Sequence, residues 1–249
     1  MVNGLRTSAA AMLAQSERLA VLSNNLANVN AAGFKAEHLQ FFQFLTSPSA
    51  VGSVSPTDPA APLFPPPGQR THIDFSAGGF RETGNPLDLA LEGSGFFVVR
   101  SADGPRLTRA GTFTRVRDGL LASADGAPVL DARQEPIRLP DRGSIVVAED
   151  GTITSDGVAV GQLLIVNPPR PERLRPEGGT RFAPPAGMEL SPATGPKVRQ
   201  GALELSNVNP VLTLIEMIDA LRVYEAAQRT ARGVDETLER AVNDVGRTS

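Results

Sequence analysis

The side chains best able to do chemistry are few in this sequence and widely spaced. Two histidines, His38 and His72, stand in or beside segments that connect regular elements. A histidine metal site needs several ligands brought together, and the sequence places too few near either residue. His72 with Asp74 and a serine would resemble a hydrolase triad, but the Gly-x-Ser-x-Gly turn that exposes such a serine is absent. The histidines therefore indicate neither a metal site nor a triad.

Other short motifs also favour structure over chemistry. Gly93-Ser94-Gly95 is too short for a phosphate-binding loop and lacks the Lys-Ser/Thr that follows one. The stretch 150–157 resembles a calcium loop only faintly, because two of its liganding positions and the closing Glu are missing. Glu82 and Glu92 could form a carboxylate pair, although a β domain contains such pairs by chance. We therefore predict no catalytic, cofactor-binding or metal-binding residues, no cofactor, and a protein that is not an enzyme.

Composition narrows the class of protein further. The 249 residues are 41% hydrophobic, which can support a real core, and the formal net charge is −3. This charge gives no electrostatic reason to expect nucleic acid or an anionic membrane as a partner. Cysteine is absent, so disulfides and thiolate metal sites are excluded. No apolar run approaches the roughly 20 residues that span a bilayer, and the first residues do not resemble a cleaved leader. We expect a soluble protein, or one exported without a cleaved leader.

Both ends of the chain have helical patterns with a seven-residue repeat. In the first, the repeat runs through Leu5, Met12, Leu19 and Leu26. Small residues lie between them, and three further residues widen the stripe: Ala9, Ser16, Leu13, Ala20 and Ala27. Such a repeat drifts slowly around a helix, so it can follow a partner helix. We expect the helix to end within 28–33, where Asn and Gly accept the left-handed backbone.

The C-terminal pattern is stronger and spans about four heptads. Its two rows are Met217, Tyr224, Ala231, Leu238 and Val245, and Ala220, Ala227, Val234 and Ala241. Asn209-Pro210 suits a helix start, with Asn as the cap and Pro at the first helical position. These rows predict a coiled-coil-like seam. The alternative is that both terminal helices pack on their own domain.

The middle of the chain has β patterns. Residues 46–70 hold seven prolines and predict an extended linker. From about Phe75 to Leu205, short apolar runs alternate with five Asp-Gly pairs, and residues 96–107 predict a hairpin. A second proline-rich stretch, 167–196, is expected to be a surface excursion. The fold class is therefore α+β: paired terminal helices form an inner domain (1–45 and 206–249), and a linker (46–70) leads to a central all-β domain, sandwich-like or barrel-like (71–205).

Three ordered segments resemble the flagellar rod and hook family of axial proteins. Residues 22–35, LSNNLANVNAAGFK, are similar to that family's N-terminal signature, with Ala31 where Thr is usual. Residues 84–97 and 107–113 look like its core hairpin, with Leu107 where Tyr or Phe is common. Residues 201–210, GALELSNVNP, followed by Met217-Ile218 and 222–225, match its closing signature. The resemblance spans nearly the whole chain.

The resemblance implies a structural subunit of the flagellar basal-body rod. In such proteins the terminal helices pair, many subunits stack helically around a channel, and the β domain projects outward. It implies copies of this chain and other axial proteins as partners, export through the flagellar type III apparatus, and a location in the periplasmic rod. The segment 150–166 looks more like the proximal than the distal rod form, and the Phe-x-Asn-Pro-x-Gly-Leu segment usual in the distal form is absent. The distal rod stays the alternative subtype.

We expect seven residues to carry the assembly interface: Leu5, Met12, Leu19, Leu26, Met217, Tyr224 and Leu238. Five asparagines are expected to satisfy backbone groups where the helices end: Asn24, Asn25, Asn28, Asn207 and Asn209. Two other classes of function remain as alternatives. One is a monomeric β-domain module that binds glycan or peptide, and the other is a cell-wall hydrolase with a catalytic acid in a cleft.

Overall fold

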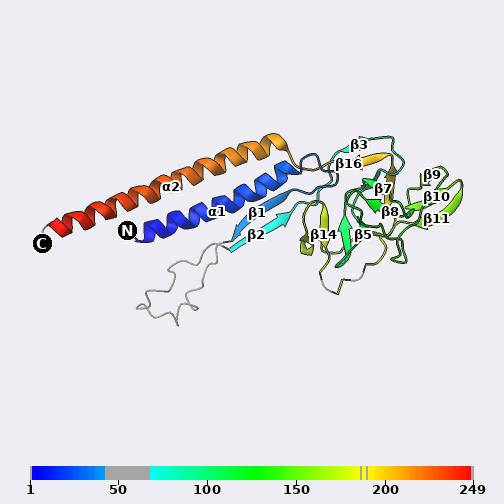
Figure 1. The fold of residues 1–249 in the computed structure, drawn as a ribbon, viewed down its shortest axis with the longest axis horizontal. Coiled ribbons are helices and arrows are strands. Elements are labelled where there is room, and N and C mark those ends of the chain that lie inside the picture. Colours follow the sequence, from blue (N-terminus) through cyan, green and yellow to red (C-terminus); the bar gives the residue numbers. More distant parts are fainter. Residues whose placement is uncertain (1, 43–67, 186, 189, 248–249) are drawn as a thin grey trace. The chain divides into compact units, whose positions relative to one another are not determined.

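A computed structural model describes residues 2–42, 68–185, 187–188 and 190–247. Along the sequence, the described chain begins with helix α1 (Val2–Ala27) and ends with helix α2 (Pro210–Arg247), and all the strands come between them in the chain order (Figure 1). The α+β class predicted from the sequence is confirmed at this level. None of the described helices is apolar over enough of its length to span a bilayer.

The strands are short and form several small sheets. Their bounds are β1 Glu37–Phe42, β2 Gly68–Ile73, β3 Phe80–Glu82, β4 Leu89–Glu92, β5 Phe96–Ser101, β6 Gly104–Thr108, β7 Phe113–Arg115, β8 Leu121–Ser123, β9 Ile145–Val147, β10 Thr152–Ser155, β11 Val158–Gln162, β12 Ile165–Val166, β13 Arg175–Pro176, β14 Arg181–Ala183, β15 Lys197–Gln200 and β16 Ala202–Glu204. A 3₁₀ helix, η2, covers Pro171–Arg173. The largest sheet has the strand order β12-β5-β6-β14-β13.

The chain divides into two compact units. The first takes the described residues within 1–24, 37–72 and 211–249, and the second takes 25–36 and 73–210. The predicted linker falls mainly outside the described residues, and its last three residues begin β2. The predicted boundaries of the four segments stay a prediction.

The helix ends agree with the sequence patterns. Helix α1 ends at Ala27, and the turns that follow lead to Gly33, whose φ is 67°. Only a residue without Cβ adopts this left-handed backbone at little cost. Helix α2 begins at Pro210, directly after Asn209, as the capping pattern predicted.

The predicted hairpin is confirmed as β5 and β6. The two strands pair antiparallel, with Ser101 opposite Gly104 at the turn. Successive residues of β5 point to opposite faces. Phe96 and Val98 join one buried cluster, while Phe97 and Val99 join another. Because both faces of β5 are buried, this strand is the centre of the second unit's core.

The proline-rich stretch 167–196 is not the surface excursion that its composition predicted. Its strand β14 pairs with β6, and Phe182 lies in the same buried cluster as Leu107. Phe182 also makes an edge-on ring contact with Phe96, at 5.9 Å between centroids. The prolines interrupt the β pattern in the sequence, but the short strands between them still bury apolar side chains.

Candidate functional site: a buried ion cluster that joins the signature segments

Three segments that are far apart in the sequence meet at one buried cluster of charged side chains. It consists of Lys35, Arg109 and Glu204, and we call these three residues the clasp. Lys35 Nζ lies 2.6 Å from Glu204 Oε1, and Arg109 Nη1 lies 3.3 Å from Glu204 Oε2. The side chains of Lys35 and Glu204 are 0% exposed, and that of Arg109 is 5% exposed. One carboxylate therefore balances one of two buried positive charges.

Backbone carbonyls accept further hydrogen bonds from the two cations, whereas the buried Arg109 Nε has no partner among the described residues. Lys35 Nζ donates to the Ser76 carbonyl at 2.6 Å. Arg109 donates through Nη1 to the Leu91 carbonyl at 3.2 Å, and through Nη2 to the Gly93 carbonyl. Burial lowers the pKa of Lys35, and the hydrogen bond and charge of Glu204 oppose this change. Burial also lowers the pKa of Arg109, again opposed by Glu204. The negative charge of Glu204 therefore reduces the free-energy cost of burying the two cations.

The main chains around the clasp approach one another very closely. The Gly33 N–H donates to the Glu204 carbonyl at 2.8 Å, and the Gly78 N–H donates to Glu204 Oε1 at 3.0 Å. A Cβ on Gly33 would lie 2.2 Å from the carbonyl carbon of Arg109, and one on Gly78 would lie 2.0 Å from the Leu205 carbonyl oxygen. Larger residues cannot occupy these positions without moving the backbone.

Asn207 adds a second connection between the same segments. Its Oδ1 accepts a hydrogen bond from the Ala36 N–H at 2.7 Å, and its Nδ2 donates to the Asp74 carbonyl at 2.9 Å. Phe34 and Val208 pack together beside it. The chain that leaves α1 and the chain that enters α2 are thus fixed to each other within the second unit.

The other predicted helix-end asparagines have different surroundings. Asn25 is buried and Asn28 is half-buried, and each backbone carbonyl accepts a hydrogen bond in the turns after α1. Asn24 and Asn209 are exposed, and the Asn24 side chain hydrogen-bonds to Glu37. That hydrogen bond opposes the effect of burial, which raises the pKa of Glu37. The role proposed for the five asparagines as a group stays a prediction.

The predicted assembly residues lie on α1 and α2. The side chains of Met12, Leu19 and Leu26 are half-buried, as are those of Met217 and Tyr224. The side chains of Leu5 and Leu238 lie outside the described part of the chain. Their role as an assembly interface stays a prediction.

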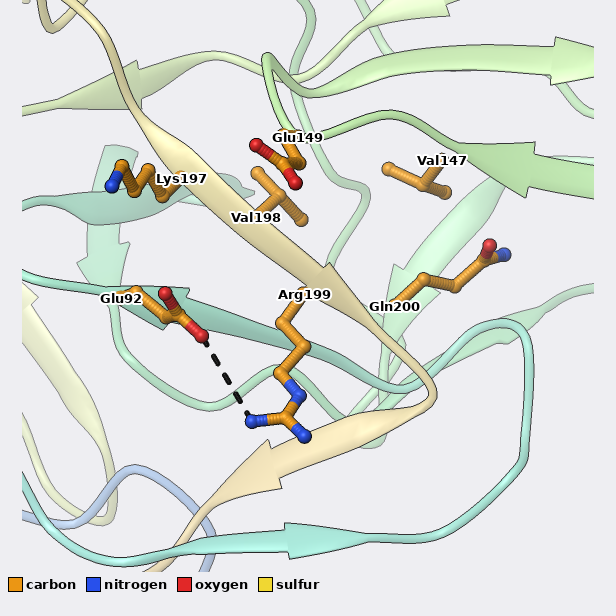
Figure 2. A pocket seen from close by; sticks show the side chains of 7 residues that line it. All are labelled: Glu92, Val147, Glu149, Lys197, Val198, Arg199 and Gln200. Carbon is orange, nitrogen blue, oxygen red and sulfur yellow. Dashed lines mark ion pairs between the residues drawn. The ribbon is translucent and has the colours of Figure 1, made fainter.

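The candidates for chemistry are occupied by structural contacts. Arg199 contacts both predicted carboxylates, at 2.6 Å from Glu82 and 3.9 Å from Glu92. Glu92 and Arg199 also line an open groove along β15 with a volume of about 400 Å³, together with Lys197 and Glu149 (Figure 2). Both carboxylates singled out in the sequence are therefore paired with the same arginine.

Two further acidic candidates, Asp74 and Asp150, make local hydrogen bonds. Asp74 accepts hydrogen bonds from the backbone and hydroxyl of Ser76, both at 2.9 Å, and Asp150 does the same with Thr152. These bonds lower the pKa of the exposed Asp150 carboxyl. His38 and His72 are exposed. Among the described residues, no group of three His, Cys, Asp or Glu could hold a metal ion.

The clasp was missed as a unit, although each of its residues lies in a signature segment. Lys35 ends the first signature, Arg109 lies in the second, and Glu204 lies in the third. A charged residue inside an apolar or small-residue run, such as Glu204 between Leu203 and Leu205, was the available signal. Because the three residues are far apart in sequence, nothing local indicated that they pair.

Three models of known protein families match this chain, and each covers one of the three signature regions. Family models match residues 5–35, described as "Flagella basal body rod protein", and residues 90–155, described as "Flagellar hook protein FlgE/F/G D1 domain". A third matches residues 199–244 and is described as "Flagellar basal body rod FlgEFG protein C-terminal". Each match contains one clasp residue.

Curated relatives match over almost the whole chain. The "Flagellar basal-body rod protein FlgF" of Caulobacter vibrioides is 30% identical over 99% of this chain and 99% of its own length. A protein of the same name from Rhizobium meliloti is 31% identical, again over 99% of each chain. The "Flagellar basal-body rod protein FlgG" of Agrobacterium fabrum is 31% identical over 94% of this chain and 96% of its own length. The chain therefore belongs to the flagellar basal-body rod protein family, and it is a structural subunit of the rod.

Proposed function

We propose that this rod subunit lies in the proximal part of the rod and polymerises through its terminal helices into the tube that transmits motor torque. Its neighbours would be copies of itself and other axial proteins. The likeness of residues 150–166 to the proximal form supports the position. Relatives named FlgF and FlgG match the chain about equally well, so they do not separate the two subtypes.

The pattern of exposure along the helices supports their pairing. On α2, the covered or half-covered side chains are Thr213, Met217, Ala220, Tyr224, Ala227, Ala231 and Val234. On α1, within the first unit, the corresponding rows are Ser8, Ala11, Gln15, Arg18 and Leu22, with Ala10, Met12, Ala14, Leu19 and Val21 partly covered beside them. Steps of three and four residues are the spacing of a helix-to-helix seam. We propose that these rows face each other.

The clasp is the observation that carries the proposal. It holds residues 33–36 and 204–208 together, so the end of α1 and the start of α2 leave from one buried junction. Buried ion pairs hold these two chain segments to each other within the second unit, because breaking them leaves uncompensated charges.

Export and location follow from the same family resemblance. We propose that the chain leaves the cell through the flagellar type III apparatus without a cleaved leader, and that it is placed in the periplasmic section of the rod. A chain without cysteine cannot form disulfides on this route.

Mass spectrometry of purified hook–basal bodies from the source bacterium tests the position. A few copies per particle would support the proximal rod, tens of copies would favour the distal rod, and absence from intact particles would contradict a rod subunit. Leu19→Asp and Leu238→Asp should abolish incorporation and leave the β domain folded, whereas Gln228→Asp, at an exposed position of α2, should incorporate normally. Normal rods from both Leu variants would refute assembly through these helices.

A further inference from the structure

The two histidines of this chain lie on neighbouring strands. His38 is the second residue of β1, and His72 is the last but one of β2. The two strands pair as a small sheet and run in opposite directions (Figure 1). Because β1 begins beside the end of β2, the pairing brings both histidines to the same end of this sheet.

The backbone places the two histidines directly opposite each other. Just before β1 and just after β2, the Asp74 N–H donates to the Ala36 carbonyl at 2.9 Å. In an antiparallel ladder such a bond joins opposed residues, and each step forward on one strand is matched by a step back on the other. Two steps further along, His38 therefore lies opposite His72. The lengths of the strands fit this register, since each covers six residues.

Both imidazoles lie on the exposed face of the sheet. Side chains alternate between the two faces along a strand, and opposed residues share a face. His38 is exposed while the next residue, Leu39, is half-buried. His72 is exposed while the next residue, Ile73, is buried. The Cβ atoms of opposed residues lie about 4.5–5.5 Å apart, so the two rings can converge on one ion at about 2.0–2.1 Å from each nitrogen.

We propose that His38 and His72 together bind one divalent transition-metal ion, with Cu²⁺ preferred over Ni²⁺ and Zn²⁺. Neutral imidazole is a good ligand for all three ions, and the general order of their affinities places Cu²⁺ first. Among the described residues, no third His, Cys, Asp or Glu completes a site, so water takes the remaining positions around the ion. The bound ion links β1 to β2. This inference does not depend on where the subunit lies in the rod.

The small number of histidines makes the site simple to test on the purified full chain without a histidine tag. Its imidazole NMR spectrum contains the signals of His38 and His72 alone. During titration with Zn²⁺, we expect both sets of signals to shift together, on one saturation curve that ends at one ion per chain. With Cu²⁺ in place of Zn²⁺, electron paramagnetic resonance should show coupling to two imidazole nitrogens.

Exchanging two neighbouring residues gives a matched control. Thr71→His combined with His72→Thr keeps the composition and both histidines, but it moves one of them to the other face of the sheet. Zn²⁺ affinity should fall at least about tenfold, because two ligands held close together bind one ion more tightly than either alone. His38→Gln, at an exposed position, should cause the same loss and keeps the test valid if the exchange disturbs the strand. Equal affinity in these variants and the original chain would overturn the inference, as would separate saturation curves for the two imidazoles.

Hydrogen exchange tests whether the ion links the strands. A ligand that binds only the paired strands, at ten times its dissociation constant, disfavours their separation by about tenfold. Amide hydrogens of β1 and β2 that exchange through strand separation should therefore exchange about tenfold more slowly with Zn²⁺ at that concentration. In His38→Gln the same addition should leave the rates unchanged. Unchanged rates in the original chain would show that no ion links the two strands.

Discussion

Removing the charge of Glu204 is the sharpest test of the clasp. Glu204→Gln keeps the shape of the side chain but removes the carboxylate that pairs with the buried Lys35 and Arg109. Both carboxylate oxygens accept hydrogen bonds, and the amide NH2 that replaces one of them cannot, so the change removes the charge and one acceptor. We expect local opening around Lys35 to become much more frequent, because the native state loses the compensation that burial requires.

The size of the effect follows from the burial of the pair. Breaking a buried ion pair by removing one partner costs about 3–5 kcal/mol. Each 1.4 kcal/mol changes an equilibrium tenfold, so the opening equilibrium should rise by a factor of about 100 to 4,000. The exposed pair between Glu82 and Arg199 is the matched control. Glu82→Gln should cost less than about 1 kcal/mol, since exposed ion pairs contribute little.

The assay uses the scarcity of lysine in this chain. Lys35 and Lys197 are its two lysines, and Lys197 is exposed. Amine acylation followed by mass spectrometry therefore reports Lys35 against an internal standard. In the unsubstituted protein, Lys197 should react quickly and Lys35 only through opening. In Glu204→Gln, the rate at Lys35 should rise by the factor above, while the rate at Lys197 stays unchanged.

Two results would refute this reasoning. Lys35 could react as fast as Lys197 in the unsubstituted protein, which would mean that it is not buried in solution. Alternatively, Glu204→Gln could leave the rate at Lys35 within about threefold of the original, although the variant is folded. The clasp would then not depend on charge compensation.

Three further predictions concern stability, each measured by urea unfolding of the purified chain. Gly33→Ala should cost at least about 2–3 kcal/mol because of its left-handed φ and the nearby backbone, whereas Gly84→Ala, with the same φ sign and open space, should cost about 1 kcal/mol. Phe182→Ala should cost about 3–5 kcal/mol, and a value below about 1 kcal/mol would contradict its place in the core. Burial alone would raise the pKa of Asp125, but hydrogen bonding, chiefly from the Ser123 hydroxyl, lowers it overall. The native pKa is then below the unfolded one, so the loss caused by Asp125→Asn, less than about 1 kcal/mol at pH 7, should disappear as the pH falls through that lowered native pKa.

Local patterns in the sequence predicted the elements well. The heptad rows, the Asn209-Pro210 start and the hairpin turn at 103–104 all depend on neighbours within a few residues. All five glycines of the Asp-Gly pairs have positive φ, which agrees with the predicted turns. At these positions the local backbone preference agrees with the final fold, so residues close in sequence were enough to predict the helices and turns.

Contacts between distant residues could not be predicted in the same way. Lys35 and Glu204 are 169 positions apart, and neither flanking segment indicates the other. Phe182 was obscured because surrounding prolines dominate the composition of its stretch. The exposed apolar side chains at the start of α2, such as Ile215 and Ile218, were not predicted, because a seven-residue repeat marks only one side of a helix.

The wide separation of Lys35 and Glu204 in the sequence also limits when the second unit can fold during synthesis. During synthesis at about 5–20 residues per second, Lys35 is made roughly 8–34 s before its acid. Until Glu204 has been made, burying Lys35 and Arg109 would leave two positive charges without this counter-charge. Burial of an unpaired charge is unfavourable, so both side chains are expected to stay hydrated. Native closure of the second unit is therefore favourable only after residue 204 has been made. The same pairing that stiffens the finished subunit thus keeps the nascent chain open and delays premature closure.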